Sequence, residues 1–487
     1  MKPQRKMQSK AAACSKRNSA LIFFMFLFFA SSANNLQVSN LRINLNNAEE
    51  FAIIHVDVSW ENSWRTESSP YNWDAVWLFC KYQTADKKWH HAMLDSTGNI
   101  APINGVIKSV PEKTGVFIYR ELPGEGNVNY TDVSIKWNYD SVDINDILKI
   151  EVFALEMVYV PTGAFALGSG GTELNHFVLI TINTADATVK PSGNTGILNT
   201  KSGGYPPGFP PASYTDYPNG YKAFYCMKYE LTQSQYTDFL NTLEPLQATA
   251  RYYDPASSPK DPRRYAIVYD TIAEKYYCNA PDLPLDFLDF KDGAAYADWA
   301  GLRPMTELEF EKACRGTAIP VANEFAWGTT QIYHSDYEFI NCGSDSELIA
   351  NPSIIAGNAI YRETLGSLNG PARVGIFAAS SPNHSRIETG ASFYGIMELS
   401  GSIGERIVNY STIDGRNFRN INGDGAINSA GFANAVSWPA VKDGGGTRGG
   451  KFNSPVQQLR ISDRETSNKT LNARDHNIGW RFVYGLK

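Results

Sequence analysis

Histidine and cysteine are scarce in this chain, which has seven His and six Cys among 487 residues. The histidines stand at positions 55, 90, 91, 176, 334, 384 and 476, and this spacing offers no cluster from which a facial metal site could be built. Five cysteines follow the N-terminal leader, and their odd number and wide spacing do not predict a disulfide framework. The sequence also lacks a recognisable Gly-rich phosphate loop and a Ser/His/Asp set.

Long apolar runs are equally scarce, because only residues 21–29 form one, and no later run is long enough to span a membrane. Residues 1–18 carry six basic side chains and no acidic one, and the small residues Ser31, Ser32 and Ala33 follow the run. This pattern predicts a secretory signal peptide over residues 1–33, with an uncleaved N-terminal anchor as the alternative. We therefore expect an extracytoplasmic protein (secreted, periplasmic or at the cell surface) without a permanent membrane span.

The chain carries a net negative charge. Removal of residues 1–33 changes the formal net charge from −6 to −12. An acidic surface repels phosphate backbones, so we expect no nucleic-acid partner.

Residues 34–155 show strand patterns throughout. Segments 51–60, 75–82, 115–119, 133–139 and 148–160 are rich in β-branched and aromatic residues, and turn-forming clusters separate them. Short strands without helical periodicity predict an all-β sandwich domain. The pair His90 and His91 lacks a third ligand at metal-site spacing, so we expect no metal there.

A well-specified helix is predicted just after Met305. Thr306 and Glu309 can form a capping box, and Met305 and Phe310 stand at the positions of a hydrophobic staple. Phe310, Ala313 and Cys314 share one apolar face, and Gly316 can end the helix in the left-handed conformation.

The segment that contains this helix, residues 303–313, resembles the Arg-Leu-Pro-Thr-Glu-x-Glu-Trp-Glu-x-Ala segment of formylglycine-generating enzymes, the sulfatase-modifying-factor family. Further blocks resemble the family in the same order, at residues 157–168, 225–240, 284–300, 325–328, 448–450 and 479–482. The resemblance implies an α+β class, in which a C-type-lectin-like domain over residues 156–487 follows the all-β sandwich domain.

Residues 391–406 resemble the block with which the family binds calcium through one side chain, two backbone carbonyls and a glutamate. The ligands that the resemblance implies here are Glu398, Gly401, Ile403 and Glu405, and oxygen ligands of this kind suit Ca²⁺. The alternative is that the two glutamates only anchor loop amides. A second calcium site of the family begins with an Asn that aligns with Asn341, but its later Asp cannot be identified.

The family's oxidation depends on two cysteines that bind copper(I), a soft ion that prefers thiolates. In this chain their positions are Ser454 and Leu459, Lys451 takes the place of the active-site serine, and Gly404 takes that of a pocket tryptophan. The resemblance therefore implies that copper is not bound and that formylglycine is not made.

In this fold, residues 448–474 line the former catalytic face, and here they are rich in amides and guanidinium groups that suit sugars or peptides. The predicted ligand-binding face consists of Lys451, Ser454, Gln458, Arg460, Arg464 and Trp480. The alternative is that Arg460, Arg464 and Arg481 pair with Asp463, Glu465 and Asp475 to hold the fold together.

We expect an exported, non-catalytic sulfatase-modifying-factor-like protein that acts in ligand binding or cell-envelope organisation, with an envelope glycan or protein as its partner. The alternative is a metal-dependent oxidoreductase of the same family with an altered active site.

Overall fold

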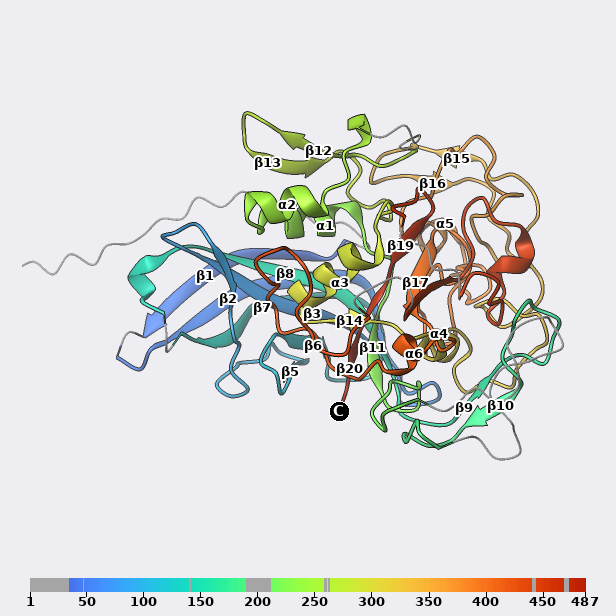
Figure 1. Cartoon of the computed structure of the whole chain (residues 1–487), viewed down its shortest axis with the longest axis horizontal. Helices are drawn as coiled ribbons and strands as arrows, with labels where there is room; N and C mark the ends of the chain where they lie inside the picture. Colours follow the sequence, from blue (N-terminus) through green and yellow to red (C-terminus); the bar gives the residue numbers. More distant parts are fainter. Residues whose placement is uncertain are drawn as a thin grey trace, which may run out of the picture.

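The computed structural model describes residues 35–46, 48–139, 142–189, 212–257, 261, 263–439, 444–467 and 473–487. The predicted signal peptide lies outside these residues. Within them, no helix is both long enough and apolar enough to cross a membrane. Figure 1 shows the N-terminal strands on one side of the molecule and the C-terminal domain on the other.

The N-terminal region is built of strands, as its sequence pattern predicts. Their bounds are β1 (Gln37–Asn46), β2 (Phe51–Arg65), β3 (Asp74–Thr84), β4 (Trp89–His91), β5 (Gly105–Ser109), β6 (Val116–Arg120), β7 (Gly124–Asn138) and β8 (Ile147–Val160). Strands β1, β2 and β7 form one antiparallel sheet, in the order β1-β2-β7. Side chains of β2 alternate between buried and partly exposed, so this sheet packs one face on a core.

The second sheet of the sandwich extends into the C-terminal domain. Its strands follow the order β14-β20-β11-β8-β3-β6-β5, with β4 paired to β3, and it therefore includes strands of the C-terminal domain. These are β11 (Phe224–Met227), β14 (Arg303–Pro304) and β20 (Phe482–Gly485). Strand β8 pairs with β3 along its length and with β11 at its end, where Met157 lies opposite Met227. The predicted boundary between residues 155 and 156 thus falls inside one strand, and no linker separates the two domains.

Strand β3 explains how the two domains are joined, because both of its faces are buried. Val76, Leu78 and Cys80 pack in the sandwich core, whereas the alternate residues Trp77 and Phe79 pack in the core of the C-terminal domain. A strand covered on both faces shows a continuous apolar run instead of alternation. The run at residues 75–80 fits that rule.

The C-terminal domain adds short helices and short strands. The helices are α1 (Gln233–Asn241), α2 (Pro245–Arg251), α3 (Phe290–Trp299), α4 (Glu307–Arg315), α5 (Ile376–Ser380) and α6 (Ile413–Arg416). The remaining strands are β9 (Phe165–Leu167), β10 (Ile180–Ile182), β12 (Ile267–Asp270), β13 (Lys275–Cys278), β15 (Phe339–Ile340), β16 (Leu348–Ile349), β17 (Gly404–Val408), β18 (Gly445–Arg448) and β19 (Ile478–Trp480). Many strands with few helices confirm the predicted α+β class.

The local signals of helix α4 are confirmed. Thr306 and Glu309 form the capping box, and Gly316 ends the helix with φ 63°. Phe310, Ala313 and Cys314 are fully buried. The charged residues of this helix are buried as well, which the amphipathic pattern did not predict.

Candidate functional site

The two positions that correspond to the copper cysteines lie in the segment after β18. The Ser454 hydroxyl donates a hydrogen bond to Gln458 Oε1 at 2.6 Å, and Leu459 is fully buried beside Phe325 and Trp327. Neither a hydroxyl nor an isobutyl group is a ligand that copper(I) prefers. These residues do not fit the copper site of the family.

Lys451 fills the space next to Gly404. A Cβ atom added at Gly404 would lie 3.2 Å from both Cγ and Cε of Lys451, so the aliphatic part of the lysine packs over the glycine. A tryptophan at position 404 could not be accommodated without moving Lys451. The two substitutions at this place are therefore compatible with each other.

The predicted ligand-binding face is only partly present. Lys451, Gln458 and Arg460 are partly exposed, and Ser454 is buried. Arg464 and Trp480 are fully buried, so neither can contact a ligand on the surface, and we correct the prediction for both. Trp480 packs edge to face on Phe290 in the core of the domain.

Arg464 belongs instead to a buried network of paired charges, which we call the paired cluster. Both carboxylate oxygens of Glu307 accept hydrogen bonds from Arg464 at 2.8 Å, and one of them also accepts from Arg448. Arg448 continues the network to Glu311, which in turn binds Arg315 at 3.0 Å. The predicted alternative of structural arginines therefore holds for Arg464, but its carboxylate partner comes from helix α4 rather than from its own segment.

Three of the predicted calcium ligands (Glu398, Gly401 and Ile403) lie in the loop that leads into β17, and the fourth, Glu405, lies at the start of that strand. Gly401 has φ 100°, and a Cβ atom there would lie 2.6 Å from the carbonyl oxygen of Ile360, so only glycine fits. Glu398 accepts a hydrogen bond from the Gly375 amide, and Glu405 accepts one from Arg481 Nε at 2.7 Å. The second carboxylate oxygen of each glutamate is buried without a hydrogen bond among the described residues.

A third glutamate, Glu230, lies in the same place and was missed at the sequence level. Its carboxylate is buried 3.8 Å from Arg481 Nη2, and neither of its oxygens accepts a hydrogen bond from another described side chain. Burial and the neighbouring Glu398 raise the pKa of Glu230 well above its usual value. Burial also raises the pKa of Glu398 to about 7 and that of Glu405 above its usual range. We call Glu230, Glu398, Glu405 and Arg481 the acid-rich cluster.

The acid-rich cluster has the chemistry of a cation site, because three buried carboxyl groups lie around one guanidinium and four of their oxygens accept no hydrogen bond from the described residues. Among the described residues, no three His, Cys, Asp or Glu side chains are already arranged to hold a metal ion. The calcium ligands that the resemblance implies include only two carboxylates, those of Glu398 and Glu405. The backbone carbonyls of Gly401 and Ile403 supply the other ligand oxygens. The residues present fit a hard cation such as Ca²⁺ in composition.

Asn341 lies apart in a surface turn after β15. Its side chain is exposed and donates to the carbonyl of Ser346 at 3.3 Å. No hydrogen bond joins Asn341 to an Asp within the part of the chain that the structure describes, so a second calcium site at Asn341 stays a prediction.

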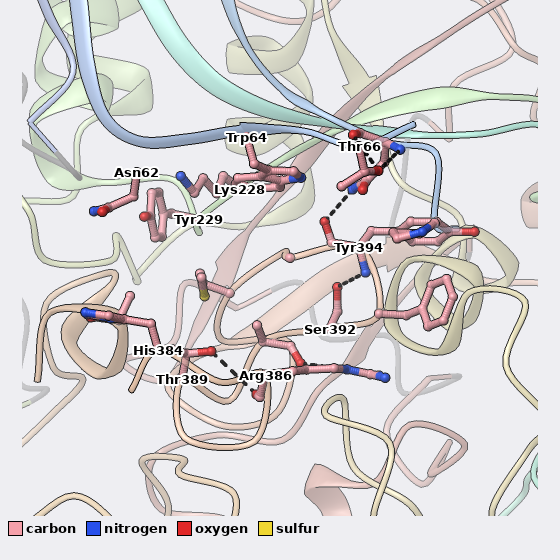
Figure 2. Close-up of a pocket in the computed structure, with 17 residues that line it drawn as sticks. Asn62, Trp64, Thr66, Lys228, Tyr229, His384, Arg386, Thr389, Ser392 and Tyr394 are labelled. Carbon is pink, nitrogen blue, oxygen red and sulfur yellow. Dashed lines mark hydrogen bonds between the residues drawn. The ribbon is translucent and has the colours of Figure 1, made fainter. Parts of the chain in front are cut away.

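A pocket of about 340 Å³ lies where the sandwich meets the C-terminal domain. Trp64 and Thr66 come from the end of β2 and the residue after it, whereas Tyr229, His384 and Arg386 come from the C-terminal domain (Figure 2). None of the residues 448–467 lines this pocket. The sequence gives no sign of this pocket, because its two walls are more than 150 residues apart in the chain.

Comparison with known proteins identifies the domain. A family model described as "Sulfatase-modifying factor enzyme 1-like domain" matches residues 151–486. Among solved structures, the chain is similar to Treponema denticola variable protein 1, with 12% sequence identity and a TM-score of 0.33, over 69% of this chain and 96% of that one. The comparison with curated proteins found no match. Since the family model covers more than half of the sequence, the chain belongs to the family of sulfatase-modifying factor enzyme 1-like domains.

Proposed function

We propose that this protein is an exported member of its family that binds a ligand at the cell envelope and does not carry out the family's oxidation. The observation that carries the proposal is the pair of residues at positions 454 and 459. The serine hydroxyl is engaged with Gln458, and the leucine is packed in the core. Two thiolates at these places are what copper(I) chemistry would need.

Side chains that stay exposed in the segment after β18 support a role in ligand binding. Lys451, Gln458 and Arg460 keep part of their side chains exposed on the former catalytic face. Amide and guanidinium groups make directional hydrogen bonds to hydroxyl and carbonyl groups. An envelope glycan or a protein segment is the partner that this chemistry favours, and export follows from the leader sequence.

Calcium is the cofactor that we propose. The buried surplus of negative charge at Glu398 and Glu405 needs a compensating cation or protons, because an uncompensated charge in the interior is costly. Oxygen ligands favour Ca²⁺ over softer metals. In this proposal the ion stabilises the loop before β17 and takes no part in catalysis.

The oxidation is tested with the mature chain, loaded separately with copper(I) and iron(II) and incubated in oxygen with a cysteine-containing sulfatase-motif peptide. Mass spectrometry reports whether the cysteine has become formylglycine. We expect the peptide to remain unchanged. Conversion by the wild-type chain would overturn the proposal and support the alternative of a metal-dependent oxidoreductase.

The double variant Ser454→Cys/Leu459→Cys is the matched control for this experiment. It restores the two thiols on the same scaffold, and copper(I) retention by this variant but not by the wild-type chain would show that the missing thiols are the cause. Copper(I) retained equally by both would contradict the assignment of these two positions.

A further inference from the structure

A lysine is buried against two carboxyl groups where the sandwich meets the C-terminal domain. Lys228 directly follows β11, Asp74 begins β3, and Glu156 lies in β8. The Lys228 Nζ atom lies 3.1 Å from Glu156 Oε2 and 3.8 Å from Asp74 Oδ2. Each of the three residues is at most 5% exposed. Neighbouring strands of one sheet therefore bring an amine and two carboxyl groups together away from bulk water.

The surroundings of these three residues are largely aromatic. The Lys228 Nζ atom lies 5.0 Å from the ring centre of Trp64 and 5.6 Å from that of Tyr229. Figure 2 shows the side chains of Lys228, Trp64 and Tyr229 next to one another. Burial raises the pKa of Asp74 above its usual value, although Lys228 and three hydrogen bonds oppose the shift. A carboxyl group that holds its proton more readily can react with an amine, whereas a carboxylate resists attack.

The carboxyl group of Asp74 is held in a fixed orientation. Its Oδ1 atom accepts hydrogen bonds from the Ser63 hydroxyl at 2.7 Å and from the Trp64 amide at 3.0 Å. Its Oδ2 atom accepts one from the Trp60 indole at 2.9 Å. Donors of this kind stabilise the negative charge that develops on oxygen when a nucleophile attacks the carbon. Oδ1, with two donors, is suited to stay as an amide oxygen, and Oδ2, the oxygen paired with Lys228, is suited to leave.

We propose that Lys228 and Asp74 form an intramolecular amide bond, an isopeptide bond, that joins the C-terminal domain to the sandwich. A bond forms between Lys228 Nζ and Asp74 Cγ, and the bond between Cγ and Oδ2 breaks. Starting from the ammonium and the carboxylate, Nζ loses two protons, which leave with Oδ2 as one molecule of water. Nothing is oxidised or reduced. Glu156 relays the protons from Nζ to Oδ2 and ends in its starting state.

The alternative is a buried ion pair that stays non-covalent, as in the paired cluster. The cations of the paired cluster are guanidinium groups, which remain protonated and are not nucleophiles. Lys228 carries an amine, which becomes a nucleophile once it has lost a proton. It also lines the pocket at the domain junction, which gives the released water a route out.

This inference goes beyond the proposed function. None of the three residues belongs to the former catalytic face, and failure of the inference would leave the oxidation experiment unaffected.

The bond is tested directly in the wild-type chain from residue 34 to the C-terminus. The intact mass should be the calculated mass less one molecule of water, and a tryptic digest should contain a branched peptide with both Asp74 and Lys228. Lys81 is the internal control, because it is buried as deeply but donates to the backbone carbonyl of Trp299 at 2.7 Å. Trypsin should cleave after Lys81 and not after Lys228. Cleavage after Lys228, with no branched peptide, would overturn the proposal.

Two variants separate the covalent bond from a structural ion pair. Lys228→Arg keeps a positive charge beside Asp74 and Glu156 but has no amine, so it should have the full calculated mass. Its circular dichroism spectrum reports whether it folds like the wild-type chain.

Glu156→Gln keeps both reacting groups but cannot relay protons, so the bond should form about 100-fold more slowly than in the wild-type chain. The measurement is the fraction of branched peptide in freshly purified protein and after storage. A loss of one water in Lys228→Arg, or a branched fraction in Glu156→Gln equal to that of the wild-type chain at purification, would contradict the proposed reaction.

Discussion

The two buried charge clusters of the C-terminal domain differ in their balance. In the paired cluster, three carboxylates (Glu307, Glu311 and Glu324) meet three guanidinium groups (Arg448, Arg464 and Arg315). Each oxygen of Glu307 and Glu311 has a guanidinium partner within 3.2 Å. In the acid-rich cluster, three glutamates lie around Arg481. Both oxygens of Glu230 and one oxygen each of Glu398 and Glu405 have no hydrogen-bond partner among the described residues.

This difference distinguishes buried charges that are compensated within the protein from buried charges that need a bound ion or protons. A balanced network of buried ion pairs satisfies itself and holds segments of the chain together, whereas a surplus of one sign has to be compensated from outside. The paired cluster therefore explains why helix α4 is buried together with its charges. The acid-rich cluster is the part of the same domain that we expect to bind a cation.

The largest effect is expected when the paired cluster is broken. Glu307→Gln keeps the shape of the side chain but leaves Arg448 and Arg464 without their common carboxylate. Loss of one partner of a buried pair costs about 3–5 kcal/mol, so the free energy of unfolding in urea should fall by that amount. The exposed Glu363→Gln is the control. If Glu307→Gln lowers the free energy of unfolding no more than the control does, the paired cluster contributes little to stability.

A single carboxyl group that is partly buried and belongs to neither cluster gives a smaller effect on stability, and this effect depends on pH. Burial raises the pKa of Asp238 in α1 to about 7, with Glu151 adding to the shift and Lys275 opposing it. Since the folded-state pKa lies above the unfolded one, the folded state holds the proton more tightly, and stability falls as pH rises from about 4 to 7.

Asp238→Asn should therefore be more stable than the wild-type chain at pH 8, by about 1–3 kcal/mol, and similar to it near pH 4. Urea unfolding at both pH values checks this, with the exposed Asp345→Asn as the control. If the free energies of unfolding of Asp238→Asn and the wild-type chain differ by the same amount at both pH values, Asp238 is not the group that titrates.

The smallest effect is expected at the position of the first missing cysteine. Ser454→Ala removes one neutral hydrogen bond, to Gln458 Oε1, and should cost about 0.5–1.5 kcal/mol. Thermal unfolding measures this loss. A loss above that range would mean that Ser454 belongs to a larger network than its contact with Gln458.

Features set by neighbouring residues could be predicted from the sequence. The capping box of α4, the strands of the sandwich and the buried face of α4 all depend on spacings of a few residues. The absence of the copper ligands could also be predicted, because it depends only on which residues stand at two positions.

Features set by the fold could not be predicted in this way. Arg464 pairs with Glu307 across 157 residues, so its role as a ligand-binding residue was a reasonable but wrong interpretation of a polar segment. Glu230 lies in the block at residues 225–240 and approaches Arg481 from 251 residues away in the chain, so the sequence pattern gave no sign that its carboxylate joins the acid-rich cluster. Trp480 was expected near the surface, but it packs in the core because β19 is a buried strand.

The most direct test of the difference between the clusters is a calcium titration. The calcium-free chain is titrated with Ca²⁺ by isothermal titration calorimetry, and its thermal unfolding is followed with and without the ion. Binding of one Ca²⁺ per chain, lost in Glu398→Gln and Glu405→Gln but retained in Glu311→Gln, is the predicted result. At 100-fold excess over Kd the ion should stabilise the fold by about 2.7 kcal/mol. Absence of calcium binding, or binding that survives both substitutions in the acid-rich cluster, would contradict this account and leave protons as the compensation for the surplus charge.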